Sequence, residues 1–210
     1  MGIQVPVARK KKEQSAAGSL IELVTIVAVA LGLALGIQAF LVKPFRIPSE
    51  SMVPTLAIGQ RVLVDRVSQR FSDPDRGDVT VFKPPKGADD DRCGVRKPEN
   101  MPCPRPTKDR SDTNFIKRIV GMPGERLKVI NNRVYINGRK QDEPFINSRT
   151  PCEQLCNMPR EITIPKDHYF MMGDSRGASA DSREWGPVPR KWLIGQAFVT
   201  YWPPKRIGPL

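Results

Sequence analysis

A long uncharged apolar stretch near the start of the chain constrains its fold most strongly. Residues 23–42, LVTIVAVALGLALGIQAFLV, carry no charge, and only Thr25 and Gln38 among them are polar. A helix of this length is about 30 Å long, which matches the hydrocarbon core of a bilayer. The sequence therefore predicts one transmembrane helix, with residues 20–42 as the anchor and residues 43–210 as a domain beyond the membrane.

Two other interpretations of this stretch are weaker, namely a buried helix of a soluble protein and a cleaved signal peptide. A signal peptide has an apolar region of only about 7–15 residues, and FLVKPF, which leads out of this stretch, lacks a good small-x-small cleavage site. Basic residues 9–12 precede the stretch, whereas only Lys43 and Arg46 follow closely. The positive-inside rule then places residues 1–19 in the cytoplasm. The expected location is the cell (inner) membrane, crossed once, with the rest of the chain extracytoplasmic.

The formal net charge of +12 points to an anionic partner. Nucleic acid and the headgroups of anionic lipids both fit such a charge, and solvated loops that bind nothing would also account for it. The sequence has no zinc-finger or RNA-binding pattern but does have a predicted anchor. We therefore expect contact with lipid and none with nucleic acid.

Four cysteines, Cys93, Cys103, Cys152 and Cys156, lie in the part predicted to be outside the cytoplasm, where disulfides persist. Four cysteines allow three pairings, and the sequence favours the two local ones, Cys93 with Cys103 and Cys152 with Cys156. Free thiols and a metal site are the alternatives. The spacing is poor for zinc and no histidine lies near, so no metal is expected.

Short alternating segments after the anchor predict strands, and 21 prolines argue against a mostly helical domain. The predicted strands cover residues 60–67, 78–82, 114–121, 168–173 and 193–202. Residues 126–138 predict a hairpin with Asn131 and Asn132 at its turn. Residues 83–113 predict a surface insertion, and residues 140–160 a second loop. The expected fold class is mostly β, with an antiparallel β-sheet preceded by one N-terminal transmembrane helix.

A stiff loop that carries two serines follows the anchor. In PSESMVPTL, residues 48–56, each proline favours an extended backbone at the residue before it. The hydroxyls of Ser49 and Ser51 then have defined directions. One serine could attack a carbonyl while the other donates to the developing oxyanion. On this observation alone, an ordinary serine-rich turn is the simpler alternative.

The chain offers two candidate bases for such a serine. His168 is the only histidine and starts a predicted strand, where we expect a structural or exposed side chain rather than a Ser-His-Asp triad. In NFIKRIVG, residues 114–121, strand alternation puts Lys117 on one face with Phe115 and Ile119. Burial would lower the pKa of this lysine and leave a neutral amine that accepts a proton. Most strand lysines instead reach past their neighbours into water, so spacing alone leaves both options open.

Four segments in one order resemble the catalytic-domain boxes of bacterial type I signal peptidases, also called leader peptidases. They are PSESMVPTL, RGDVTVF, FIKRIVGMPGE and GDSRGASADSREWGPV. They span residues 48–188, behind an anchor and before a closing WPPKRIG. Each segment alone is weakly or moderately specific, whereas all four in order are very specific. The resemblance implies a membrane-anchored serine endopeptidase that uses a Ser-Lys dyad and needs no cofactor.

The resemblance also implies roles for individual residues. Ser51 would be the nucleophile and Lys117 its general base. The hydroxyl of Ser49 and the backbone N–H of Ser51 would bind the oxyanion. Three further residues would support the site from behind: Ser179, which orients the lysine amine, and the ion pair of Asp181 and Arg183.

The implied substrate is the signal peptide of a preprotein, cut after a small-x-small sequence such as A-x-A. An extended peptide would add to a strand edge, and shallow apolar pockets would reject large side chains at the −1 and −3 positions. The residues expected to line these pockets, each of which could equally belong to the core, are Phe45, Ile47, Met52, Leu56, Phe115 and Ile116. The expected partners are preprotein signal peptides, the lipid bilayer and, as a further candidate, the secretion translocon.

Some features depart from the pattern of this family. Ser175 and Ala178 stand where the last box usually carries asparagine, and residues 126–165 are few, so we expect a second β-region reduced to a hairpin and loop. The nearest alternative function is a specialised Ser-Lys maturase for a dedicated secreted or pilin-type substrate, which would use the same dyad. A self-cleaving repressor would need a DNA-binding domain in place of the anchor. A non-catalytic protein that docks lipid or peptide is the alternative outside the enzymes.

Overall fold

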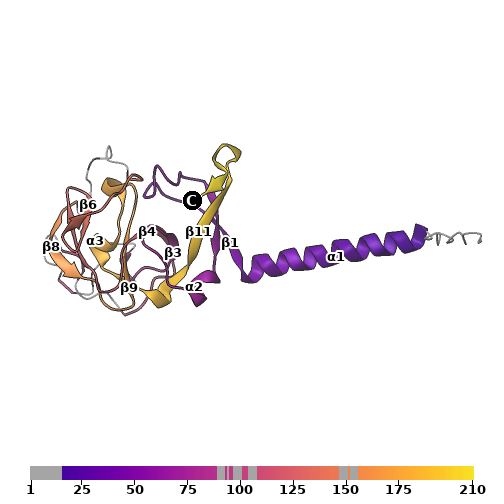
Figure 1. Ribbon diagram of the computed structural model, residues 1–210, viewed down its shortest axis with the longest axis horizontal. Coiled ribbons are helices and arrows are strands. Elements are labelled where there is room, and N and C mark those ends of the chain that lie inside the picture. The colour runs from indigo at the N-terminus through magenta and orange to yellow at the C-terminus, as the bar shows by residue number, and fades with distance from the viewer. Residues whose placement is uncertain are drawn as a thin grey trace, which may run out of the picture. The chain divides into compact units, whose positions relative to one another are not determined.

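The computed structural model describes residues 16–88, 93, 95–96, 101–103, 108–146, 151 and 156–210. The chain divides into two units, Met1–Ala39 and Phe40–Leu210. The predicted cytoplasmic basic residues 9–12 lie outside the described residues. The strands all belong to the second unit (Figure 1).

The helix α1, Ala16–Phe40, forms the described part of the first unit and ends one residue beyond it. Its segment Gly18–Ile37 has a mean hydropathy of 2.5 and is, within the described residues, the one helix long and apolar enough to cross a membrane. The helix ends two residues before the predicted end of the anchor, because Val42 already begins strand β1. Pro44 explains the early end, since the residue before a proline avoids helical backbone angles and proline itself has no N–H to donate.

An antiparallel sheet of eight strands forms most of the second unit, in the order β1-β2-β11-β3-β4-β9-β10, with β12 paired to β11. The strands are β1 (Val42–Arg46), β2 (Arg61–Asp65), β3 (Val79–Phe82), β4 (Phe115–Gly121), β9 (His168–Met172), β10 (Val188–Pro189), β11 (Leu193–Trp202) and β12 (Gly208–Pro209). The mostly β fold class and all five predicted strands are confirmed. Strand β1 was not predicted, because its residues were assigned to the end of the anchor or left without structure.

The helical segments of this unit are short. Those that lie wholly within the described residues are α2 (Ser68–Phe71), η2 (Arg176–Ala178), α3 (Ser182–Trp185), η3 (Arg190–Trp192) and η4 (Pro204–Arg206). Three of them, η2, α3 and η3, follow β9 in the chain and flank the short strand β10.

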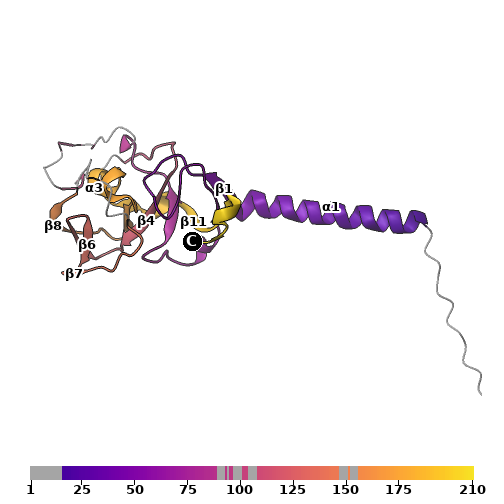
Figure 2. The same ribbon diagram turned by 90° about the horizontal axis from the view of Figure 1, so that it is seen from above.

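A second sheet of four strands follows β4 in the chain. Its order is β7-β6-β5-β8, from β5 (Arg126–Ile130), β6 (Arg133–Ile136), β7 (Arg139–Lys140) and β8 (Met158–Thr163). The predicted β5–β6 hairpin is confirmed, and both turn residues, Asn131 and Asn132, have positive φ as a type I′ turn requires. Figure 2 shows β6, β7 and β8 grouped on the side of this unit away from β1 and β11, as Figure 1 does for β6 and β8.

The prediction of a loop over residues 140–160 is wrong at its C-terminal end, because strand β8 begins at Met158. Its Pro159 has no N–H to donate, which concealed the strand in the sequence and confines it to the edge of a sheet. The strand occupies an edge as expected, since among the described strands its one neighbour is β5.

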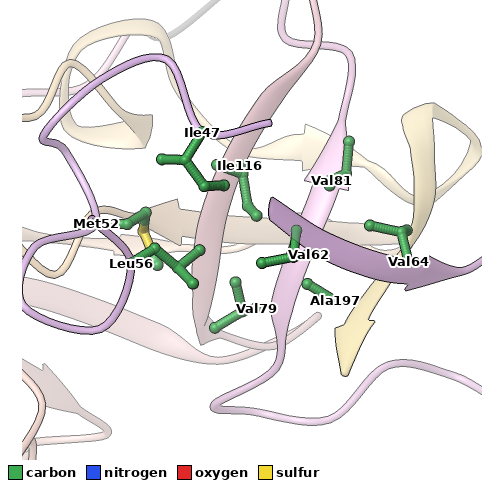
Figure 3. Close-up of a cluster of buried hydrophobic side chains, with 9 residues drawn as sticks. All are labelled: Ile47, Met52, Leu56, Val62, Val64, Val79, Val81, Ile116 and Ala197. Carbon is green, nitrogen blue, oxygen red and sulfur yellow. The ribbon is translucent and has the colours of Figure 1, made fainter. Parts of the chain in front are cut away.

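A cluster of buried side chains joins the serine loop to the large sheet (Figure 3). Ile47, Met52 and Leu56 come from the loop and meet Val62 and Val64 of β2. Val79 and Val81 of β3, Ile116 of β4 and Ala197 of β11 complete the cluster. Burying each such side chain contributes roughly 1.5–3 kcal/mol, so the loop is held against the sheet by its own apolar residues.

The predicted surface insertion, residues 83–113, is only partly a surface loop. Cys93 and Cys103 form the predicted disulfide. Cys103 is buried, and its N–H donates to the carbonyl oxygen of Glu184 in α3 at 3.0 Å. Ala88 is also buried, packed with Trp185 and Trp192. Described parts of the insertion therefore belong to the core beside α3.

The second predicted cysteine pair falls partly outside the described residues. Cys156 is disulfide-bonded. Its predicted partner, Cys152, lies outside the described residues, so the pairing of Cys152 with Cys156 stays a prediction.

Candidate active site

The loop between β1 and β2 carries the two serines on a backbone with many internal hydrogen bonds. The N–H of Ile47 donates to Gln60 at 2.9 Å, and the N–H of Gly59 donates back to Ile47 at 2.8 Å. The N–H of Leu56 donates to the carbonyl of Met52 at 2.8 Å. The loop is thus closed at its base and turned within itself, as its prolines led us to expect.

Ser49 and Ser51 lie side by side in this loop, with their Oγ atoms 3.3 Å apart. Ser51 is buried, with only 6% of the residue exposed. The carbonyl oxygen of Ser51 accepts a 3.0 Å hydrogen bond from the N–H of Ser175. A segment far along the chain therefore fixes the peptide unit that holds the Ser51 side chain.

Lys117 lies in the middle of β4, opposite Thr80 of β3, and is 5% exposed. Its Nζ is 5.8 Å from the centre of the Phe115 ring, which agrees with the predicted placement of both side chains on one strand face. Desolvation by burial is the largest influence on this amine and lowers its pKa from 10.5 to about 8. Arg183 also lowers it, while the charges of Asp181 and Asp174 oppose the shift.

One pocket of about 370 Å³ brings the serines and the lysine together. Its lining residues are Pro48, Ser49, Ser51, Thr113, Asn114, Phe115, Ile116, Lys117, Ala178 and Ala180. They come from the serine loop, from β4 with the residues before it, and from the segment after β9. Three of the four segments singled out in the sequence thus meet at one cavity.

A second pocket of about 230 Å³ adjoins the first, because Pro48, Asn114, Phe115 and Ile116 line both. Phe45 and Ile47 line this second pocket as well. Of the residues expected to contact substrate, four therefore line one or both cavities. Met52 and Leu56 line neither of the two, and both side chains are fully buried in the cluster of Figure 3.

Asp181 and Arg183 form a buried ion pair behind the pocket. Arg183 donates to the carboxylate through Nε and through Nη2, each at 2.8 Å. Burial alone would raise the pKa of Asp181, but the charge and hydrogen bonds of Arg183, together with the charge of Lys117 and the N–H of Gly173, hold the pKa below its ordinary value. Asp181 therefore stays ionised, and its charge acts on Lys117.

Ser179 donates its hydroxyl hydrogen to Asp181 at 2.9 Å. The contact between Ser179 and the lysine amine that the sequence led us to expect stays a prediction; the contact that the described residues show for this hydroxyl is the one with the Asp181 carboxylate. A hydroxyl that donates to a carboxylate keeps lone pairs with which it can accept from an amine. Ser179 and Lys117 are in any case both linked to Asp181, one by a hydrogen bond and the other by charge.

Gly173 is one residue that the sequence analysis passed over. A Cβ atom here would lie 2.4 Å from the carbonyl oxygen of Ser51 and 2.3 Å from Oγ of Ser179. Its N–H donates to Asp181 at 3.1 Å. Only a residue without a side chain lets these groups approach so closely. The glycine was visible in GDSR, but its neighbours across the fold were not.

A second overlooked group lies beneath the serine loop. Arg118 donates to Asp174 through Nε and Nη2, at 2.9 and 2.7 Å. Thr55 donates its hydroxyl to the same carboxylate at 2.6 Å. The guanidinium of Arg118 also lies 4.0 Å from the centre of the Phe145 ring. These contacts join β4, the serine loop and the residue after Gly173.

The remaining candidates of the sequence analysis lie elsewhere. His168 begins β9, and its Nδ1 lies 2.7 Å from the carbonyl oxygen of Lys166, in an exposed position. It does not line either pocket. In the part of the chain that the structure covers, no group of three or more His, Cys, Asp or Glu side chains is placed to hold a metal ion.

Comparison with known proteins assigns this chain to a family. Residues 20–202 match the family described as signal peptidase, peptidase S26. A probable signal peptidase I-2 of Synechocystis sp. is 37% identical over 95% of this chain and 81% of its own. A signal peptidase I of Leptolyngbya laminosa is 37% identical over 99% and 92%. A signal peptidase IB of Staphylococcus aureus is 30% identical over 88% and 90%. The chain therefore belongs to the signal peptidase family, peptidase family S26.

Proposed function

We propose that this protein is a membrane-anchored serine endopeptidase that removes signal peptides from exported preproteins, with Ser51 as nucleophile and Lys117 as general base. The observation that carries the proposal is the shared pocket, in which the hydroxyl and a buried amine with its pKa lowered to about 8 line the same cavity. Membership of the signal peptidase family supports the same activity.

The proposed chemistry begins with the neutral amine of Lys117. It accepts the proton of the Ser51 hydroxyl while the oxygen attacks the scissile carbonyl carbon. The tetrahedral intermediate collapses when the ammonium returns that proton to the leaving amine, which leaves an acyl-enzyme ester at Ser51. Water, deprotonated by the same amine, then hydrolyses the ester and releases the signal peptide.

The oxyanion of the intermediate would be bound by the Ser49 hydroxyl and the Ser51 N–H. The 3.3 Å separation of the two serine Oγ atoms supports this assignment, because it sets Ser49 beside the atom that attacks. Such donors act in a covered site, where a hydrogen bond to developing charge is stronger than in water. Ser179, Asp181 and Arg183 would hold the amine in place and tune its charge.

The two adjoining pockets suit the side chains at the −1 and −3 positions of a signal peptide. An extended peptide places alternate side chains on the same face, and the pockets share four lining residues, so both side chains could enter at once. Ala178 and Ala180 line the larger pocket and leave it open to a small side chain. We propose that larger residues are excluded by clash.

The helix α1 would anchor the enzyme in the cell membrane, with the N-terminus in the cytoplasm and the catalytic unit outside. Its apolar segment Gly18–Ile37 supports this proposal by length and composition. The substrate would approach from the same membrane, since signal peptides carry an apolar region before the cleavage site.

The test of this function uses the purified full chain in detergent with a preprotein that carries an A-x-A site. We expect Ser51→Ala and Lys117→Ala to reduce cleavage about a thousandfold or more. The matched controls Ser72→Ala and Lys166→Ala change exposed residues outside both pockets and should cleave like the parent protein. Equal cleavage by the parent and all four variants would contradict the proposed dyad.

A peptide panel separates this function from that of a dedicated maturase. Substituting Leu or Phe for Ala at −1 or −3 should reduce kcat/KM at least about tenfold, while unrelated preproteins with A-x-A sites should all be cut. Cleavage of a single substrate regardless of these two positions would favour the maturase.

A further inference from the structure

We infer that a basic pocket in the second unit, beside Leu41, binds the phosphate of an anionic phospholipid headgroup. The inference rests on the proposal that α1 is an anchor, and it goes beyond the peptidase site. The cavity has a volume of about 310 Å³. It is lined by Arg66, Gln69, Arg70, Pro74, Arg190, Lys191, Leu193 and Ile194, which include four cations and no carboxylate.

Three of these cations are available to a ligand. Among the contacts of the described residues, the side chains of Arg66, Arg70 and Lys191 have no hydrogen-bond or ion-pair partner. Arg190 is the fixed member of the group. Its Nε donates to Asp73 at 2.7 Å, and its Nη2 donates to the carbonyl oxygens of Gln69 and Ser72 at 2.9 and 3.0 Å. A positioned guanidinium with three unpaired cations around it suits the geometry and charge of a phosphate.

An unpaired amide lines the same cavity. Both Nε2 and Oε1 of Gln69 are buried and, within the described residues, have no hydrogen-bond partner. A buried amide without partners costs free energy that a ligand can recover. The Nε2 group can donate to a phosphate oxygen, and Oε1 can accept from a hydroxyl of the headgroup.

Two carboxylates close in sequence to the pocket residues are already engaged. Asp65 accepts from the N–H groups of Val67 and Ser68, at 2.7 and 3.1 Å, and from the Ser68 hydroxyl. Asp73 pairs with Arg190. The pocket therefore keeps a net positive charge, because neither of these acids lines it.

The place of the pocket in the chain decides which phosphate it would meet. The N–H of Arg66 donates to the carbonyl of Leu41 at 3.0 Å, and Asp65 of β2 lies opposite Val42 of β1 in the sheet. Leu41 directly follows the last residue of α1. If the apolar segment that ends at Ile37 fills the hydrocarbon core, Leu41 lies about 6 Å beyond it along the chain. The headgroup layer is about 5–7 Å thick on each side, so Arg66 would lie at that layer.

An exposed aromatic side chain next to the cations supports a lipid over a soluble phosphate compound. Phe71 ends α2, directly after Arg70, and is 86% exposed. An aromatic ring beside basic residues is typical of surfaces that lie in the membrane interface. The ring would contact acyl chains while the cations hold the headgroup.

The test measures lipid binding by the full chain in micelles of an uncharged detergent. Energy transfer from tryptophan to a phosphatidylglycerol with a dansyl-labelled acyl chain reports binding. Each Lys or Arg near an anionic surface is worth about 1 kcal/mol, or about fivefold in affinity. The triple variant Arg66→Gln, Arg70→Gln, Lys191→Gln should therefore bind on the order of a hundredfold more weakly, and Phe71→Ser about tenfold more weakly.

A matched triple variant controls for net charge. Arg139→Gln, Lys140→Gln, Arg160→Gln also removes two arginines and a lysine, all from exposed positions on the small sheet. It should bind within about threefold of the parent. Equal weakening of the two triple variants, or none in either, would overturn the inference.

Competition identifies the ligand. Unlabelled phosphatidylglycerol should displace the probe, whereas phosphatidylcholine and inorganic phosphate should not at equal concentration. Complete displacement by inorganic phosphate would assign the pocket to a soluble phosphate and overturn the lipid assignment; displacement by phosphatidylcholine would overturn selectivity for anionic lipid. Signal-peptide cleavage in detergent alone should be unchanged in the pocket variant, so failure of this inference leaves the peptidase proposal standing.

Discussion

The N–H of Ser175 donates a 3.0 Å hydrogen bond to the carbonyl oxygen of Ser51, so two segments 124 residues apart in the chain share one peptide contact. Gly173 lies against the same carbonyl oxygen and against Ser179. The position of the Ser51 side chain is therefore set jointly by its own loop and by the segment after β9.

Gly173→Ala should reduce kcat about a hundredfold or more. Its Cβ would stand 2.4 Å from the Ser51 carbonyl oxygen, so the backbone that carries the nucleophile must move. A displacement of about 1 Å near reacting groups can cost about a hundredfold in rate. Gly208→Ala is the matched control, because nothing lies within 4 Å of its Cβ. Steady-state cleavage of a signal peptide measures both, and a fully active Gly173→Ala would show that the contact does not position Ser51.

Ser49→Ala should lower kcat about a hundredfold with little change in KM. The variant removes one proposed oxyanion donor, and such a donor typically contributes about 3 kcal/mol to the transition state alone. Ser49→Thr keeps a hydroxyl at the same place and should recover much of the loss. If Ser49→Ala kept kcat within about threefold of the parent, the hydroxyl beside Ser51 would have no role at the oxyanion.

Asp181→Asn should have two separable effects. It leaves the buried guanidinium of Arg183 without its counter-charge, which costs about 3–5 kcal/mol of the free energy of unfolding. It also removes a charge that raises the pKa of Lys117, so the acid limb of the pH–activity profile should move to lower pH.

Asp73→Asn is the control for that variant. Asp73 also pairs with an arginine, but its side chain is 75% exposed, so its loss should cost no more than about 1 kcal/mol. Denaturant unfolding and the pH profile check both variants. An acid limb of Asp181→Asn that stays in place or moves to higher pH would contradict the assigned electrostatic contact.

Lys117→Met should stabilise the second unit near neutral pH. The pKa of the lysine is about 8 in the folded protein and 10.5 in the unfolded chain, so the unfolded chain binds more protons between these values. The free energy of unfolding of the parent protein should therefore rise with pH across this window. At about 1.36 kcal/mol per pKa unit, it should increase by about 2 to 3 kcal/mol relative to that of the variant between pH 7 and pH 10. Urea unfolding at several pH values measures this, and a constant difference between the proteins would mean that Lys117 is not buried.

The strands could be predicted because their alternation follows from local geometry. The same alternation put Lys117 with Phe115 on one face of β4, as the structure has it. The burial of that lysine could not be predicted from the sequence. Asp181 and Arg183, from the segment after β9, act on its amine, and only the folded chain brings them to it.

The errors of the sequence-based predictions have physical causes of the same kind. Pro159 concealed β8 because proline is rare in strands, and its place at a sheet edge is visible only in three dimensions. Met52 and Leu56 were candidates for contact with substrate, but they fill the core beneath the serine loop. The spacing of apolar residues in a short loop does not reveal which side faces the sheet.

The dependence of kcat/KM on pH tests the central assignment most directly, with a signal-peptide substrate that has no ionisable group between pH 5 and pH 10. Because the neutral amine of Lys117 is the active form, activity should rise tenfold per pH unit on the acid side and level off with a midpoint near the pKa of about 8. The limb should move in Asp181→Asn and stay in place in Asp73→Asn. A profile that is flat from pH 6 to pH 9, or a midpoint above pH 10 as for a lysine in water, would contradict catalysis by a buried neutral amine.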